Sequence, residues 1–176
     1  RRYVDLFNNV PCVGHCHPHF VKTVSSQLKT LNVHSRYLHQ SILDYADRLI
    51  STHHDSIESV IFSCTGTEAN EIALQMARLA TGGRGIICTD ATYHRNSAEV
   101  SKLTGAKSNQ GDVRSIRFPE TYRTDTEDPL NHHLRELQLV IESFREDGTP
   151  FAGMLVCPIL ANEGLPNIPK GYMAEA

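Results

Sequence analysis

Short apolar runs alternate with helical segments through most of this chain, and this alternation limits the folds it can adopt. The runs predicted as strands are residues 59–63, 85–89, 113–118 and 154–158. Apolar residues recur at helical spacing between them, and they predict helices at residues 68–80 and 130–144. Strands that alternate with helices predict βαβ units and a mainly parallel sheet flanked by helices, which is the α/β class.

The first 51 residues follow a different pattern. Residues 3–10 predict a short strand that leads into a Gly/His/Pro turn at 13–18, and helical periodicity predicts helices at 19–31 and 41–51. Ser41 is the predicted N-cap of the second helix, with Asp44 three residues further on.

The composition is that of a globular protein and excludes several classes. Hydrophobic residues make up 40% of the 176 residues and charged residues 21%. The net charge of −3 provides no basic footprint, so no nucleic-acid partner is expected. No apolar run approaches the ~20 residues that a membrane-spanning helix needs, so no membrane partner is expected either.

The cysteines point to a reducing compartment. There are five, an odd number, and they are scattered along the chain, which argues against a disulfide framework. We therefore expect a cytoplasmic protein. A mitochondrial location stays open, because the sequence begins at Arg1 without an initiator Met.

The junction between the run at 59–63 and the next helix predicts an anion site. Thr65, Gly66 and Thr67 separate the two segments, so a buried strand leads through a glycine turn to a helix N-terminus. Free N–H groups and the helix dipole favour a phosphate there, and the threonine hydroxyls add donors. The alternative is an ordinary capped helix with Thr67 as the N-cap and Glu71 in the first turn.

Two further segments follow predicted strands. Tyr93 and His94 lie beyond the strand at 85–89, and Glu163 lies beyond the strand at 154–158. Ligands of open α/β sheets bind beyond the carboxyl ends of strands, where an aromatic ring can stack on a flat cofactor and a carboxylate can orient it. The alternatives are a polar loop with Tyr93 packed on the sheet edge, and an ordinary turn at Glu163.

The histidines and cysteines do not predict a metal site. His15 and His17 flank Cys16 on one short turn, and no second ligand pair follows at zinc-finger spacing. His132 and His133 are adjacent, so on a helix their side chains point about 100° apart.

Taken together, these segments resemble the class III (omega) aminotransferases, which are pyridoxal-phosphate enzymes of fold type I. The matching stretches are residues 8–10, 13–18, 35–39, 65–71, 90–94 and 162–164, which follow in the family's order. The resemblance covers nearly the whole chain. Its nearest branches are the alanine–glyoxylate aminotransferases and the ethanolamine-phosphate phospho-lyases.

The resemblance implies a cofactor, a site and partners. Thr65, Gly66 and Thr67 would form the phosphate cradle of pyridoxal phosphate. Tyr93 would stack on the pyridine ring with His94 beside it, and Glu163 would lie near the phenolic oxygen. The resemblance also implies small-molecule amine and 2-oxo acid substrates and a homodimer. Residues 1–45 would belong to the small domain and residues 46–176 to the first part of the large, cofactor-binding domain.

The chain departs from the family pattern in two respects. Arg95 stands where the family usually has a glycine after Tyr-His. In the family, the Schiff-base lysine and the aspartate that pairs with the pyridine nitrogen come later than Glu163, and neither is identified before Ala176. The sequence is thus expected to be an N-terminal fragment that is inactive by itself.

The resemblance leaves the reaction open. Transamination from an amine or amino acid donor to a 2-oxo acid is the leading expectation. The alternatives are a phospho-lyase acting on an amino-alcohol phosphate, for which Arg36 and Arg95 are candidate phosphate-binding cations, and a non-catalytic binding module.

Overall fold

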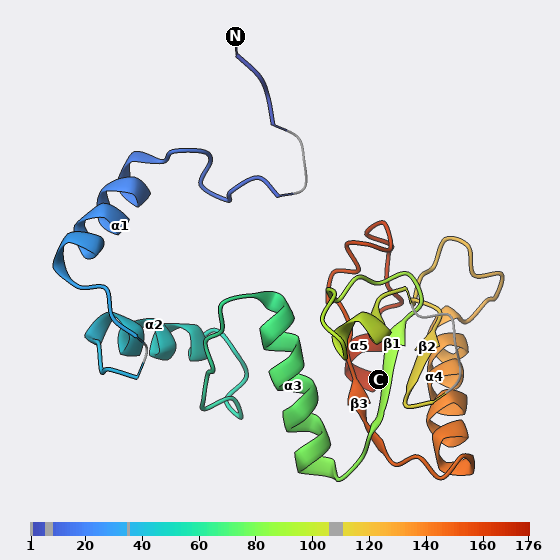
Figure 1. Ribbon diagram of the computed structural model, residues 1–176. Coiled ribbons are helices and arrows are strands. Elements are labelled where there is room, and N and C mark those ends of the chain that lie inside the picture. Colours follow the sequence, from blue (N-terminus) through green and yellow to red (C-terminus); the bar gives the residue numbers. More distant parts are fainter. Residues whose placement is uncertain (1, 6–8, 35, 106–110) are drawn as a thin grey trace. The chain divides into compact units, whose positions relative to one another are not determined.

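A computed structural model describes residues 2–5, 9–34, 36–105 and 111–176, and the chain divides into two compact units (Figure 1). The first unit is Arg1–Val60 and the second unit is Ile61–Ala176. The predicted division between a small-domain segment at residues 1–45 and a large domain at 46–176 stays a prediction.

The first unit contains the two predicted helices. They are α1, Pro18–Thr30, and α2, Gln40–Ile50. The N-cap of α2 is His39 and not Ser41 as predicted, because the His39 ring accepts a hydrogen bond from the Ser41 backbone N–H at 3.2 Å. The two helices contain no buried residue; the apolar stripe of α1 is exposed, whereas that of α2, at residues 42, 46, 49 and 50, is half-buried.

The predicted strand at residues 3–10 is wrong for the part that the structure describes. Residues 3–5, 9 and 10 lie in irregular or turn structure, whereas residues 6–8, which include Asn8, lie outside the described residues. A strand exists only where a neighbour takes up its backbone hydrogen bonds, and no described strand pairs with this segment.

The second unit contains a parallel sheet with helices, which confirms the predicted α/β class. Its strands are β1, Gly85–Thr89, β2, Val113–Ile116, and β3, Phe151–Met154, in the order β2-β1-β3 (Figure 1). Its helices are α3, Gly66–Thr81, the short 3-10 helix η1, Val100–Leu103, then α4, Pro129–Glu146, and α5, Tyr172–Glu175.

Two predicted strands need correction. The run at 59–63 is not a strand, and Ile61 and Phe62 are exposed, because no described strand lies beside it. The predicted strand at 154–158 lies three residues earlier, as β3. Its register is fixed by pairing with β1, where Gly85 lies opposite Phe151. Cys157 already belongs to a turn, because its backbone carbonyl accepts a hydrogen bond from the Leu160 N–H at 3.1 Å.

The core lies on both faces of β1, because successive strand residues point to opposite sides. Ile86 and Cys88 pack with Leu74 of α3 on one face, and Ile87 packs with Phe144 of α4 on the other. Burial raises the pKa of the Cys88 thiol to about 12, so this cysteine acts as a small apolar side chain.

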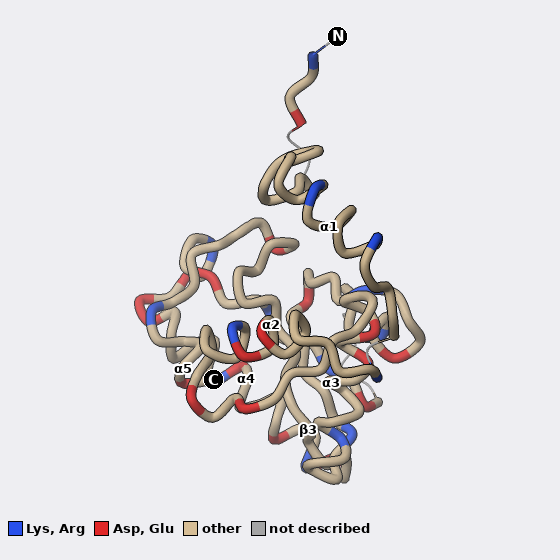
Figure 2. Tube along the Cα trace, turned by 90° about the vertical axis from the view of Figure 1, so that its left-hand side faces the viewer, with Lys and Arg blue, Asp and Glu red and all other residues tan. Residues whose placement is uncertain are grey.

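Charge is spread along the chain. Basic and acidic residues both occur in most parts of the described trace (Figure 2). None of the described helices is both long and apolar enough to cross a membrane.

Candidate functional site

The N-terminus of α3 presents free backbone donors. Thr65 is the N-cap: its hydroxyl accepts from the Glu68 N–H at 3.1 Å, and the Glu68 carboxylate accepts from the Cys64 N–H at 2.8 Å. The N-cap is therefore Thr65 and not Thr67, and the contact differs from a standard capping box because Glu68 reaches the residue before the N-cap. The N–H groups of Gly66 and Thr67, the first two of the helix, have no intrahelical acceptor, and the helix dipole adds positive potential there.

The loop after β1 lies beside this helix N-terminus. The Asn70 side chain of α3 donates a hydrogen bond to the His94 carbonyl at 3.1 Å. A Cβ added to Gly66 would lie 3.5 Å from Nε of Arg95, so the Arg95 guanidinium lies directly over this glycine. The structure therefore brings the predicted cradle and the Tyr93-His94 segment together.

Tyr93 and Arg95 are both exposed and lie next to each other. Tyr93 is 48% exposed, and Cζ of Arg95 lies 5.9 Å from its ring centroid. Arg95 has a φ of +97°, a conformation that favours glycine. This backbone conformation is the physical reason why a glycine suits this position.

The strained backbone at Arg95 is held by residues that were not predicted from the sequence. The Thr104 hydroxyl accepts from the His94 N–H at 3.1 Å and donates to the Arg95 carbonyl at 2.9 Å. The Glu71 carboxylate accepts from the Ser97 hydroxyl at 2.5 Å. Glu71 and Asn70 belong to the same motif as the cradle, whereas nothing near Thr104 in the sequence marks it.

Glu163 reaches the end of β1 from the turn that follows β3. Its Oε1 accepts from the hydroxyl of Thr89, the last residue of β1, at 2.7 Å. Its Oε2 is buried and has no hydrogen-bond partner among the described residues. A buried carboxylate oxygen without a donor is costly, so this atom marks a place for a ligand or for a further protein group.

His94 is buried close to Glu163 and does not present its ring as an exposed stacking surface. It is 7% exposed, and its Nε2 lies 3.2 Å from the Thr92 hydroxyl. Burial lowers the pKa of His94, against the opposing effects of a hydrogen bond to the Leu155 backbone and of the Glu163 charge. The imidazole is therefore neutral near pH 7.

We expect this histidine to make the fold less stable in mild acid. Since the pKa is lowered in the folded chain, the unfolded chain binds the proton more readily, and stability falls as the pH drops below the ordinary histidine value of 6.5. The free energy of unfolding, measured by urea titration at several pH values, should fall less steeply over this window in His94→Gln. Identical pH profiles for the two proteins would contradict this origin.

A cavity of about 300 Å³ lies beside Glu163 at the carboxyl end of the sheet. It is lined by Phe118, Glu120, Tyr122, Arg123, Glu163, Gly164 and Pro166. It was not predicted from the sequence, because its walls come from two segments that lie 40 residues apart at their nearest, Arg123 and Glu163.

One buried carboxylate holds the wall of this cavity. Glu120 accepts hydrogen bonds from the backbone N–H groups of Tyr122 at 2.7 Å and Arg123 at 2.6 Å, and from the Thr124 hydroxyl at 2.9 Å. Burial alone would raise its pKa, but these donors, together with the nearby Arg117, lower it. The charged carboxylate thus fixes the loop that carries Arg123.

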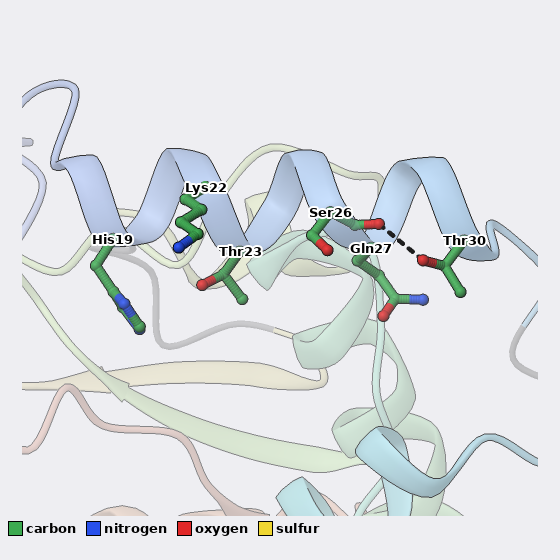
Figure 3. Close-up of a pocket in the computed structure, with 6 residues that line it drawn as sticks. All are labelled: His19, Lys22, Thr23, Ser26, Gln27 and Thr30. Atoms are coloured by element: carbon green, nitrogen blue, oxygen red, sulfur yellow. Dashed lines mark hydrogen bonds between the residues drawn. The ribbon is translucent and has the colours of Figure 1, made fainter.

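A second hollow, of about 350 Å³, lies along α1 in the first unit (Figure 3). Its lining residues all come from one polar face of this helix: His19, Lys22, Thr23, Ser26, Gln27 and Thr30. The Thr30 hydroxyl donates to the Ser26 carbonyl at 3.0 Å, an ordinary helix contact. We assign no function to it.

The chain belongs to the class III aminotransferase family, whose model matches residues 1–176. It is 34% identical to alanine–glyoxylate aminotransferase 2 homolog 2 of Arabidopsis thaliana, an alignment that covers the whole chain and 38% of that protein. It is 32% identical to ethanolamine-phosphate phospho-lyase homolog 1 of Caenorhabditis elegans over 65% of the chain and 24% of that protein.

Solved structures agree. A phospholyase from Arthrobacter, in complex with phosphoethanolamine, matches 98% of the chain and 43% of its own length with a TM-score of 0.87 and 33% identity. The chain thus spans about two fifths of the length of its first relatives. The cofactor of the family is pyridoxal phosphate, and the fold is that of its type I enzymes.

Proposed function

We propose that the protein carrying this chain is a pyridoxal-phosphate-dependent transaminase, which moves an amino group from an amine or amino acid to a 2-oxo acid. One observation carries the proposal. Three features converge at the carboxyl end of the sheet: a helix N-terminus whose first N–H groups lack an intrahelical acceptor, an exposed aromatic ring, and a buried carboxylate oxygen that lacks a donor among the described residues.

The α3 N-terminus suits the phosphate of the cofactor. The backbone N–H groups of Gly66 and Thr67 are to bind it, with the Thr67 hydroxyl as a further donor, because an anion there also gains from the helix dipole. The Thr65 hydroxyl already accepts the capping hydrogen bond, so its role is to shape the turn. Tyr93 is exposed and contacts Arg95, which itself lies over Gly66, so in this proposal the Tyr93 ring stacks on the flat ring of the cofactor.

Glu163 suits the polar edge of that ring. The Thr89 hydroxyl fixes Oε1, so Oε2 is left to accept a hydrogen bond from the cofactor or to hold a proton near it. His94 is neutral and buried behind this carboxylate, where it packs the loop against the sheet. When bound, pyridoxal phosphate supplies an electrophilic carbonyl and an electron sink.

The first unit supports the expectation of a homodimer. Phe20, Val24 and Leu28 form an exposed apolar stripe on α1, and such a surface calls for a protein partner or another part of the same protein. Small-molecule amines and 2-oxo acids are the proposed substrates. The proposed compartment is the cytoplasm. The mitochondrion is the alternative, because the Arabidopsis relative is described as a mitochondrial protein.

A phospho-lyase reaction on an amino-alcohol phosphate is the second candidate. It is favoured by the match to the Arthrobacter phospholyase, whose identity of 33% is about the same as that to the aminotransferase relative. The two reactions differ in their substrates and products. A transaminase needs a 2-oxo acid, which it converts to an amino acid, whereas the lyase needs no 2-oxo acid and releases inorganic phosphate.

The test is to incubate the protein with pyridoxal phosphate and to measure both products in parallel. One sample receives L-alanine with glyoxylate and is assayed for glycine; the other receives ethanolamine phosphate alone and is assayed for inorganic phosphate. Reactions without added donor serve as controls.

Glycine that forms only when both substrates are present is the expected result. Phosphate release from ethanolamine phosphate without glycine formation would replace transamination by the lyase. If neither product forms and the cofactor does not bind, the remaining candidate is a binding module without catalysis.

A further inference from the structure

The guanidinium of Arg95 is a positive charge at the turn proposed to hold the cofactor phosphate. A Cβ on Gly66 would lie 3.5 Å from its Nε, 3.7 Å from one terminal nitrogen and 3.9 Å from Cζ. The nitrogen atoms of the guanidinium are all hydrogen-bond donors, so only donor atoms of Arg95 lie near Gly66. No carboxylate of the described residues lies within ion-pair distance of it, in contrast to Arg78, Arg114 and Arg117.

The contacts of the Arg95 side chain contribute too little to the stability of the fold to explain an arginine at this position. Its backbone has a φ of +97°, which costs stability in any residue other than glycine. Its one aromatic contact, with the half-exposed Tyr93 ring at 5.9 Å, is weak because both groups face solvent. Thr104 nevertheless fixes the backbone at this residue, so the point from which the Arg95 side chain leaves the loop is held beside Gly66.

We propose that Arg95 binds the phosphate group of the cofactor and thereby adds a charged ligand to a cradle that is otherwise made of neutral N–H and hydroxyl donors. A guanidinium binds phosphate through two parallel N–H donors, a geometry that the hydroxyls and single N–H groups of the turn cannot supply. The inference rests on the proposed function, because it takes the Gly66 turn as the cofactor site.

The position of the side chain favours the cofactor over a phosphorylated substrate. Arg95 lies at the N-terminus of α3 itself, next to the N–H groups of Gly66 and Thr67, which have no acceptor within the helix. The cavity beside Glu163 contains a different cation, Arg123, and Arg95 is not among its lining residues. A substrate phosphate in that cavity would therefore meet Arg123 first.

The test compares two ligands that differ only in the phosphate, pyridoxamine 5′-phosphate and pyridoxamine. Neither carries the aldehyde, so binding is measured without covalent capture, by calorimetric titration of the purified protein. The variants are Arg95→Gln, Arg95→Lys and Arg95→Gly. Arg84→Gln is the matched control, because Arg84 is an exposed arginine of the same unit between α3 and the start of β1.

Arg95→Gln is expected to raise the Kd of pyridoxamine 5′-phosphate about tenfold and to leave that of pyridoxamine unchanged, since a charge-assisted hydrogen bond is lost at an exposed site. The Kd of pyridoxamine 5′-phosphate for Arg95→Lys should lie between those of the wild type and Arg95→Gln. Arg84→Gln should bind both ligands as the wild type does. Arg95→Gly should bind pyridoxamine 5′-phosphate as weakly as Arg95→Gln but melt at a higher temperature than the wild type, because its backbone strain is relieved.

Three results would overturn the inference. Arg95→Gln could bind pyridoxamine 5′-phosphate as tightly as the wild type does, which leaves the proposed function intact. In a separate titration with ethanolamine phosphate, Arg95→Gln could weaken the binding of that ligand and leave the Kd of pyridoxamine 5′-phosphate unchanged, which would assign the cation to a substrate. If the wild type binds pyridoxamine 5′-phosphate no better than pyridoxamine, the cradle itself is refuted, and the proposed function falls with it.

Discussion

Replacing Gly83 with alanine is expected to lower the free energy of unfolding of the protein by about 3 kcal/mol, since the new methyl group meets backbone that cannot turn aside. A Cβ at this position would lie 2.5 Å from the Phe151 carbonyl oxygen and 2.8 Å from that of Pro150. The same Pro150 oxygen accepts hydrogen bonds from the Arg84 and Gly85 N–H groups, at 2.8 and 2.9 Å. Relief of the clash therefore separates β1 from β3.

The control for this substitution is Gly153→Ala. Gly153 lies in β3 itself, and a Cβ there meets no atom within 4 Å. Urea unfolding of the two variants, followed by circular dichroism, should show a large loss for Gly83→Ala and less than about 1 kcal/mol for Gly153→Ala. Equal losses would show that the close approach of the chain at Gly83 is not what limits the packing.

Phe144→Ala is expected to cost about 4 kcal/mol, because it leaves a cavity in the core between α4 and the sheet. Phe144 is completely buried. Its ring centroid lies 4.0 Å from Cζ of Arg114 and 6.0 Å from the ring centroid of Phe151. The ring also covers Gly85, where an added Cβ would lie 2.9 Å from it. Removal of the ring thus exposes the start of β1 and the buried guanidinium of Arg114 together.

Leu139→Ala provides the comparison on the same helix. Leu139 is 56% exposed, so its truncation should cost less than about 1 kcal/mol in the same urea titration. A Phe144→Ala variant as stable as Leu139→Ala would mean that α4 does not depend on this ring for its packing against the sheet. Both predictions concern the sheet whose carboxyl end carries the proposed cofactor site.

The periodic part of the sequence was enough to predict the elements of the fold that form locally. The helices α1, α3 and α4 were predicted to within two residues at their first residue, and the bounds predicted for β1 were those observed. A helix satisfies its own backbone hydrogen bonds, so its pattern can be read in one segment. The helix N-terminus in this segment also followed from the sequence, whereas the predicted glycine turn is the first turn of α3, because Thr65 caps the helix and Gly66 and Thr67 are its first two residues.

The tertiary structure decided everything that depends on a neighbour. The run at 59–63 has the composition of a strand, yet no described strand pairs with it, and β3 took its bounds from the register with β1. The pairing of Thr89 with Glu163 joins residues 74 positions apart, and no local pattern announces it. The placement of Arg95 over Gly66 depends likewise on the loop after β1 returning to the N-terminus of α3. The sequence by itself determined the candidate residues of the proposed site, whereas their distances came from packing, which a pattern of residue types does not encode.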